Sequence, residues 1–445
     1  MMRPMLVRFF ELDTRRTTVA REVRGGIATF LTMAYILFAN PGILAAAGVP
    51  YEGAVAATAA AAALSCLAMG LVANAPIALA PGMGLNAVVA YHVASVTGSW
   101  QAAMALVVVE GLVVLVMVLV GLREAVMEAI PIDLRRAIAV GIGLFIAFIG
   151  AVNARLVIVP PGTIGGLARS PDALLPPVTF GSLQHADTVL ALVGLLVIAV
   201  LFVRRRTGAI VIGIATVTLL ALAAGLTTLP ERGWAAWPEF STVFQADFRS
   251  AWTLAAVPLV LSLVMVDFFD TIGTATAIGE AAGLEDEHGR LPRLRRVLAI
   301  DAAGAAVGGL AGVSSVTSYI ESAAGVAEGA RTGLHTVVVG ALFALAMFVA
   351  PLAAMVPPAA TAPALIAVGF MMAGQVTRID FRALDTAIPA FLVLLLIPLT
   401  WSIAHGIGYG FLGFTAIRVL SGRARDVHPL MYAVAAAFGA YFATG

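Results

Sequence analysis

Apolar runs of roughly 18–22 residues recur along the whole chain, and each is long enough to cross a lipid bilayer as an α-helix. The 445 residues are 61% hydrophobic and 11% charged, whereas a soluble domain is usually about 45–50% apolar and about 25% charged. The sequence therefore predicts an all-α polytopic membrane protein.

The basic residues test how many times the chain crosses the bilayer. All 26 are arginine, and about fourteen apolar runs separate the segments that carry them. If the N-terminus is cytoplasmic, nearly all arginines fall on the cytoplasmic side, and the exceptions are Arg155, Arg169, Arg232 and Arg249. A wrong number of spans would scramble this asymmetry. The positive-inside rule therefore predicts fourteen spans in the cytoplasmic (inner) membrane with both termini cytoplasmic.

Fourteen spans divide into two halves of seven, and an odd number in each half gives the second half the inverted topology. The same shift of 235 residues, with no gap, aligns two separate spans of the two halves. It places "AAAGV" on "EAAGL" and Asn86 on Glu321. The sequence thus predicts a seven-plus-seven inverted repeat.

Spans three and ten are short and are predicted to be broken. Span three reads "ANAPIALAPGMGLNAVVAYHV" (73–93), whose prolines and glycines do not fit one continuous helix. We expect an extended strand followed by a half-helix that begins at Pro81. In span ten, "AGVSSVTSYIESAAGVAEG" (311–329), Ser314 or Ser315 is expected to cap a half-helix that carries Glu321. Irregular backbone at this depth lines a cavity or is buried in protein, and such sites bind small polar solutes. The alternative is that both spans are merely kinked helices.

Span eight carries two aspartates within "LVMVDFFDTIGT" (263–274). Each aspartate at the membrane centre costs about 2.5–3.5 kcal/mol, so such residues are functional candidates. Asp267 and Asp270 lie three residues apart and so share a helix face, which Thr271 and Thr274 extend. Two carboxylates without a nearby cation suit a site that gains and loses a proton. We therefore predict proton coupling through Asp270 and Asp267, and a structural or relay role for Thr271.

Other polar residues in the apolar spans are candidates as well. Glu321 is expected to face the aspartate pair, and Asn86 can both donate and accept hydrogen bonds without carrying charge. Glu110 in span four suits a structural or proton-relay role, and Asp301 in span nine is expected to hold backbone groups of the broken spans. Metal-ligand spacing and phosphate-binding glycine loops are absent from the sequence, so we predict no metal and no cofactor. The net charge of +1 gives no indication of nucleic-acid binding.

Four motifs in order, "GGIATFLTMAYILFANPGILAAAGVP", "ALAPGMGLNA", "DFFDTIGT" and "SYIESAAGVAEGARTGL", resemble those of the AzgA-type purine permeases. These belong to the nucleobase–cation symporter group, which includes uracil and xanthine permeases. The resemblance covers nearly the whole chain. It implies the seven-plus-seven fold, a core domain (spans one to four and eight to eleven) and a gate domain (spans five to seven and twelve to fourteen). It also implies uptake of adenine, guanine or hypoxanthine with protons, often by a homodimer.

On this resemblance the chain divides into seven segments. They are a cytoplasmic segment 1–24, core 25–122, gate 123–229, an external loop 230–252, core 253–356, gate 357–420 and a C-terminal segment 421–445.

The resemblance also assigns roles at the site. Asp267 and Glu321 become direct purine contacts, and Asn86 and Asp270 become residues needed for transport. Ser318 and Phe268 are further candidates for contact with the purine. A flat heterocycle is expected to stack on an aromatic ring, for which Phe30, Phe268, Phe269 and Tyr319 all stay open.

The sequence has two alternative interpretations besides a proton-coupled purine symporter. The first is a uracil or xanthine permease, or an anion transporter, on the same fold; two acidic residues without a central arginine argue against an anion. The second is a membrane-embedded enzyme, which the sequence disfavours because both aspartates share one span and nothing supplies a nucleophile or metal. Protons are preferred to sodium because no cluster of neutral oxygen ligands is evident.

Overall fold

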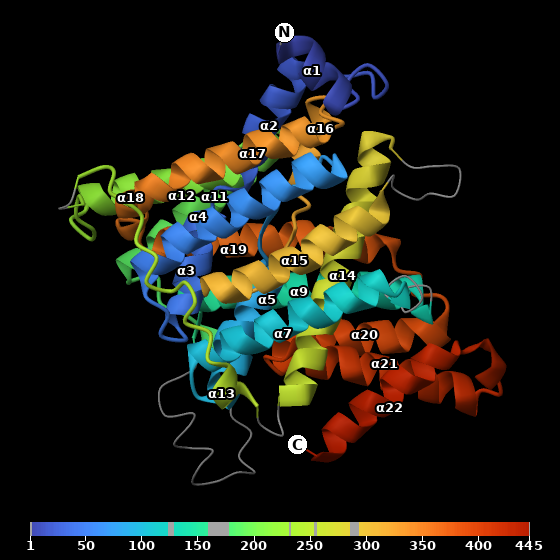
Figure 1. Cartoon of the computed structure of the whole chain (residues 1–445). Helices are drawn as coiled ribbons and strands as arrows, with labels where there is room; N and C mark the ends of the chain where they lie inside the picture. The colour runs from blue at the N-terminus through green and yellow to red at the C-terminus, as the bar shows by residue number, and fades with distance from the viewer. Residues whose placement is uncertain are drawn as a thin grey trace.

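The structure, a computed structural model, describes residues 2–122, 129–158, 178–230, 233–252, 256–284 and 293–444. It is a bundle of long helices that run side by side (Figure 1). Within the described residues, eight helices are long and apolar enough to cross a membrane, and shorter apolar helices accompany them. The eight are Val19–Ala45, Tyr51–Ala73, Trp100–Leu119, Ile132–Asn153, Ala186–Val203, Gly333–Ala353, Pro358–Arg378 and Ile403–Leu420. The prediction of a mostly helical multi-pass membrane protein is confirmed.

The elements of the first half follow the predicted spans in order. They are α1 (Met2–Phe9), α2 (Val19–Met33), α3 (Ile36–Ala45), α4 (Tyr51–Ala68) with its π-helical end η1 (Met69–Ala73), β1 (Leu79–Pro81), α5 (Met83–Val88), η2 (Val89–Val93), α6 (Ala94–Thr97), α7 (Trp100–Leu119), α9 (Ile132–Asn153), β2 (Val157–Ile158), β3 (Thr179–Phe180), α11 (Ala186–Val203), α12 (Ala209–Ala223) and α13 (Phe248–Ala251).

In the second half, long helices again flank a short strand that is followed by a short helix. It comprises α14 (Ala256–Ala282), α15 (Leu294–Ala311), β4 (Val316–Ser318), α16 (Ser322–Ala327), α17 (Gly333–Ala346), η3 (Met347–Val349), α18 (Ala350–Ala354), α19 (Pro358–Ala373), η4 (Gly374–Arg378), α20 (Leu384–Leu399), α21 (Ile403–Leu420), η5 (Ala424–Asp426) and α22 (Pro429–Thr444). Two predicted segment boundaries, at residues 123 and 253, lie outside the described residues.

Spans three and ten are broken as predicted: each has a short strand followed by a short helix. Strands β1 and β4 pair antiparallel, with Leu79 opposite Ser318 and Pro81 opposite Val316. The pairing is tight, because a Cβ added at Gly82 would lie only 2.5 Å from Thr317 Cγ2. Glycine at this position therefore allows the two broken spans to meet.

The predicted helix starts were wrong by a few residues. The first short helix begins at Met83 rather than Pro81, because the Gly82 N–H still donates to Ser315 O (2.9 Å) and keeps the chain extended. Glu321 precedes α16 instead of lying within it, and Ser314 and Ser315 come before β4 and cap no helix. The pairing of β1 with β4 keeps the chain after these residues extended, so neither serine reaches the helix start that the sequence predicted for it to cap.

The helices pack in two sets. In one set α17 packs against α2 and α4, α15 and α14 pack against α7, and α16 packs against α2. In the other, α19 packs against α9, α11 and α12, and α20 packs against α9 and α21. Contacts between the sets are fewer: α9 touches α5 and α14, α19 touches α3, α21 touches α14, and α12 touches α2.

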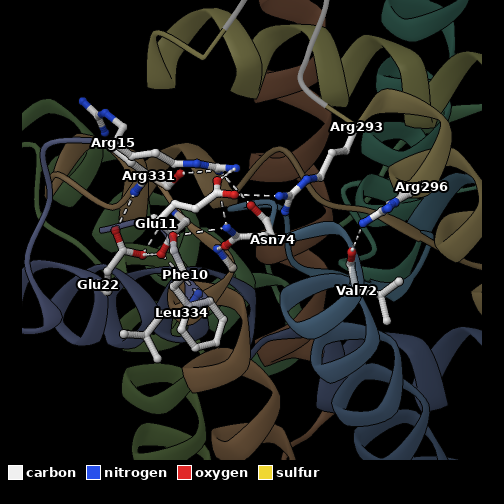
Figure 2. A network of polar contacts seen from close by, with 12 residues as sticks. Phe10, Glu11, Arg15, Glu22, Val72, Asn74, Arg293, Arg296, Arg331 and Leu334 are labelled. Atoms are coloured by element: carbon white, nitrogen blue, oxygen red, sulfur yellow. Dashed lines mark hydrogen bonds and ion pairs between the residues drawn. The ribbon is translucent and has the colours of Figure 1, made fainter. Parts of the chain in front are cut away.

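A buried polar network joins the N-terminal segment to α2, α4 and the start of α17 (Figure 2). The Glu22 carboxylate is fully buried and accepts hydrogen bonds from Thr17 Oγ1 (2.8 Å), the Arg331 N–H (2.8 Å) and the Thr332 hydroxyl (2.8 Å). It also accepts from the N–H groups of Thr332 and His335 (3.2 and 3.1 Å), so it satisfies the N-terminus of α17.

A second carboxylate, Glu11, extends this network toward α15. Glu11 pairs with Arg15 (3.1 Å) and Arg293 (2.6 Å). Asn74, at the end of η1, donates to Phe10 O (3.1 Å) and accepts from the Gly333 N–H (2.7 Å). The network therefore holds together one end of the helix set that contains α2, α4 and α17.

We expect Glu22→Ala to lower the stability of the folded protein by about 3 kcal/mol or more. The substitution leaves three backbone N–H groups without their acceptor, and an unmade bond of a buried donor costs about 1–3 kcal/mol. The measurement is the thermal midpoint of the purified protein in detergent. Glu239→Ala, at an exposed glutamate, is the matched control, and an equal midpoint in both variants would contradict the prediction.

Candidate functional site

A cavity of about 670 Å³ lies between the two helix sets, next to the broken spans. Its volume is typical of small-molecule sites, about 300–1,000 Å³. The polar residues at its buried part are Thr32, Tyr35, Asp270, Thr274, Ser318 and Glu321, and the apolar residues include Met83, Ile142, Tyr319, Val368 and Met371. The cavity thus combines apolar walls with a few convergent polar groups.

One face of α14 runs along this cavity. Asp270, Thr274, Ala277 and Glu280 all line it, at the spacing of successive helical turns. Thr274 is buried, whereas Glu280 is exposed. The cavity therefore has a buried end near Asp270 and an exposed end near Glu280.

Glu321 is held at the buried end by a tyrosine from the first span. The Tyr35 hydroxyl donates to Glu321 Oε1 (2.8 Å), and Tyr35 itself is fully buried at the turn between α2 and α3. Thr32, one turn earlier, also lines the cavity. The carboxylate is therefore oriented toward the cavity by a group from another span.

Asp301 forms a hub beneath the cavity. Its Oδ1 accepts from the Ser318 N–H (3.0 Å) and hydroxyl (2.9 Å), and its Oδ2 accepts from Thr271 Oγ1 (2.6 Å). Because Thr271 uses its one proton there, it accepts from the Thr317 hydroxyl in their 2.9 Å contact. This hub fixes β4 against α14 and α15.

The structure brings together part of the predicted site. Asp270, Glu321 and Ser318 line the cavity, although the Ser318 hydroxyl is engaged with Asp301. Thr271 and Asp301 form the hub. The other predicted residues are fully buried and do not line the cavity; they are Asp267 and Phe268 in α14, Asn86 in α5 and Glu110 in α7. Asn86 Nδ2 donates to Pro81 O (3.3 Å), and the transport roles assigned to these residues stay predictions.

Of the aromatic candidates, Tyr319 lines the cavity, and its hydroxyl donates to Pro81 O (2.5 Å). Phe30 instead packs edge-on against Phe343, with ring centroids 5.1 Å apart. The side chain of Phe269 lies outside the described residues.

The predicted site did not include Tyr35, Thr32, Met83 or Met371, all of which line the cavity. The available signal for Tyr35 was its hydroxyl within the apolar run "FLTMAYILFANP", which also contains the hydroxyl of Thr32. Its direction depends on the turn between α2 and α3, which helical periodicity alone does not predict.

A multi-pass bundle whose two broken spans meet beside a buried polar cavity defines a membrane transporter. Residues 20–409 match the model of the Permease family, and the chain belongs to this family. It is thus a permease and not an enzyme, and the resemblance to AzgA-type permeases is confirmed.

Two bacterial relatives match almost end to end. Guanine/hypoxanthine permease PbuG of Bacillus subtilis is 39% identical, over 98% of this chain and 98% of the relative. Adenine permease AdeP of Escherichia coli is 37% identical, over 98% of this chain and 95% of the relative.

The fold is also that of solved transporters with little sequence similarity. The transmembrane domain of the cyanobacterial bicarbonate transporter BicA superposes with a TM-score of 0.65 at 16% identity, covering 87% of this chain and 97% of that domain. The structure of SLC26A9 superposes with a TM-score of 0.63 at 11% identity, covering 91% of this chain and 66% of that chain.

Proposed function

We propose that this permease is a proton-coupled symporter that imports purine nucleobases (adenine, guanine or hypoxanthine) across the inner membrane. The observation that carries the proposal is the cavity lined by both Asp270 and Glu321 in a chain whose full-length relatives bear the names of purine permeases. Both termini are cytoplasmic in this proposal, as the arginine distribution favours.

The chemistry of the cavity suits a neutral, flat heterocycle with donors and acceptors on its edge. Carboxylates at Glu321 and Asp270 accept ring and exocyclic N–H groups, and a protonated carboxyl also donates. The apolar walls formed by Ile142, Val368 and Tyr319 cover the faces of the ring. In this proposal Glu321 and Asp270 contact the purine directly, and Asp270, with Asp267 one turn earlier on α14, carries the coupling proton.

The two helix sets supply a mechanism of alternating access. We assign the set with α2, α7, α14 and α17 to a core domain (25–122 and 253–356), and the set with α9 and α19 to a gate domain (123–229 and 357–420). In this proposal the chain has fourteen spans, and its N-terminal and C-terminal seven spans form an inverted repeat. The cavity is lined by residues of both sets, so a movement of one against the other opens the site to alternate sides. Assembly as a homodimer is proposed on the family resemblance.

Binding of purines by the purified protein tests the substrate class. We expect adenine, guanine or hypoxanthine to raise the thermal midpoint, because a ligand at 100 times its Kd stabilises the folded state by about 2.7 kcal/mol. Uracil and xanthine at the same concentrations are the comparison ligands. Stabilisation by uracil or xanthine alone would move the protein to another branch of nucleobase permeases.

A further inference from the structure

Four arginines line the exposed end of the same cavity. Arg135 and Arg136 lie in the first turn of α9, Arg206 lies between α11 and α12, and Arg378 ends η4. Arg136 pairs with Asp133 (3.1 Å) and donates to Arg378 O (2.5 Å). Among the described residues, the side chains of the other three form no ion pair and no hydrogen bond, although Glu280 lines the same end. Within the described part of the chain, the arginines at this end of the cavity outnumber the carboxylates, so this end carries net positive charge.

Orientation in the membrane accounts for only part of this arrangement. The positive-inside rule places arginines on the cytoplasmic side, but it does not require them to converge on one cavity. Arg135 Nε is buried without a hydrogen-bond partner, and a buried, unpaired polar atom is costly. The planar guanidinium of arginine matches a phosphate in two parallel, charge-assisted hydrogen bonds.

The distance between the arginines and the buried end suits one ligand that reaches both. Ile142 lies near the short helix of span three, since a Cβ added at Gly84 would come within 2.7 Å of Ile142 Cγ2. Arg135 is seven residues earlier on α9, a rise of roughly 10 Å. A base, a sugar and a phosphate joined in sequence span such a distance. The carboxylates of Asp270 and Glu321 repel a phosphate, so only one orientation of this ligand is favourable.

We propose that the cavity also binds a purine nucleoside monophosphate from the cytoplasmic side, with its base at Glu321 and Asp270 and its phosphate on Arg135, Arg206 and Arg378. The nucleotide is an inhibitor and not a cargo, because its phosphate stays at the arginines and holds the cavity open on that side. The proposal rests on the proposed function for the identity of the base. Transport would then slow when the cytoplasmic nucleotide pool is full.

The test is competition for a radiolabelled base on the purified protein in nanodiscs of phosphatidylcholine. For whichever of adenine, guanine and hypoxanthine binds tightest, the competitors are its nucleoside and its nucleoside monophosphate. We expect the monophosphate to compete at a concentration at least about tenfold lower than the nucleoside, since one charge-assisted contact contributes about that factor. The advantage should shrink as salt is raised.

The triple variant Arg135→Gln, Arg206→Gln, Arg378→Gln should bring the ratio of the two concentrations close to one, while Arg425→Gln keeps it. Arg425 is exposed and does not line the cavity. A monophosphate that competes no better than the nucleoside, or an advantage that survives in the triple variant, overturns the proposal.

Two further measurements separate binding of lipid phosphate, and failure of the proposed function, from binding of the nucleotide. Phosphatidylglycerol in the nanodiscs supplies a lipid phosphate; if it abolishes the advantage of the monophosphate, the arginines bind lipid and the nucleotide assignment is wrong. Direct binding of radiolabelled monophosphate is measured in parallel. If the monophosphate binds but no base does, the proposed function fails while the arginine site stands.

Discussion

Glu321→Gln is expected to lower purine affinity about 100-fold while leaving the permease folded. Glutamine has the same size and keeps an oxygen that accepts from the Tyr35 hydroxyl, the contact that orients residue 321 (2.8 Å). It loses the charge and one acceptor, and a hydrogen bond to a charged group contributes about 1.5–3 kcal/mol, which corresponds to about 10- to 150-fold. The measurement is equilibrium binding of the radiolabelled base that the wild-type protein prefers.

The matched control is Glu328→Gln. Glu328 follows α16 on the same segment, is exposed, and does not line the cavity. Its affinity should stay within about twofold of wild type. An unaltered affinity in Glu321→Gln, in protein with a normal thermal midpoint, would remove Glu321 from the site.

The second large effect is expected at Asp301, where Asp301→Ala should lower stability by about 3 kcal/mol or more and abolish uptake. The substitution removes the acceptor of three hydrogen bonds, from the N–H and hydroxyl of Ser318 and from Thr271. The buried N–H of Ser318 then has no acceptor, and bonds to a charged acceptor contribute about 1.5–3 kcal/mol each. The thermal midpoint and base uptake are measured on the same preparations.

Two variants separate position from charge at this hub. Asp301→Asn keeps one oxygen that accepts from Ser318, so it should lose less stability than Asp301→Ala. Asp187→Ala, at an exposed aspartate of α11, should leave both readouts near wild type. Full stability and full uptake in Asp301→Ala would show that the hub does not position β4.

For the broken spans, the sequence predicted the interruption of the helices but not the residues at which the short helices begin. Prolines and glycines near Pro81 predicted the interruption of span three, because proline removes a helical hydrogen bond and glycine weakens a helix. The sequence also placed Asp301 as an anchor of backbone groups, and the structure has it bonded to the Ser318 N–H. The starts of both short helices were displaced because β1–β4 pairing is a long-range interaction between segments more than 230 residues apart.

Which polar groups line the cavity was also not predictable, because this too depends on packing between segments that are far apart in the sequence. Asp267 and Asp270 share a helix face, so periodicity treats them alike, yet in the structure only Asp270 lines the cavity. That difference depends on where α5 and α9 pack against α14. The arginines at the exposed end of the cavity come from three separate segments. Their positions in the sequence predicted which side of the membrane each segment faces, but not that the side chains converge on one cavity.

Uptake into proteoliposomes shows whether the permease accumulates purines with protons and whether Asp270 carries the coupling proton. Radiolabelled adenine, guanine, hypoxanthine, xanthine and uracil are offered with and without an inward proton gradient, to wild type and to Asp270→Asn. We expect gradient-driven accumulation of one or more of the first three bases, and loss of the gradient effect in Asp270→Asn because asparagine cannot exchange a proton. Accumulation of uracil or xanthine alone, or purine uptake that is the same with and without the gradient, would contradict it.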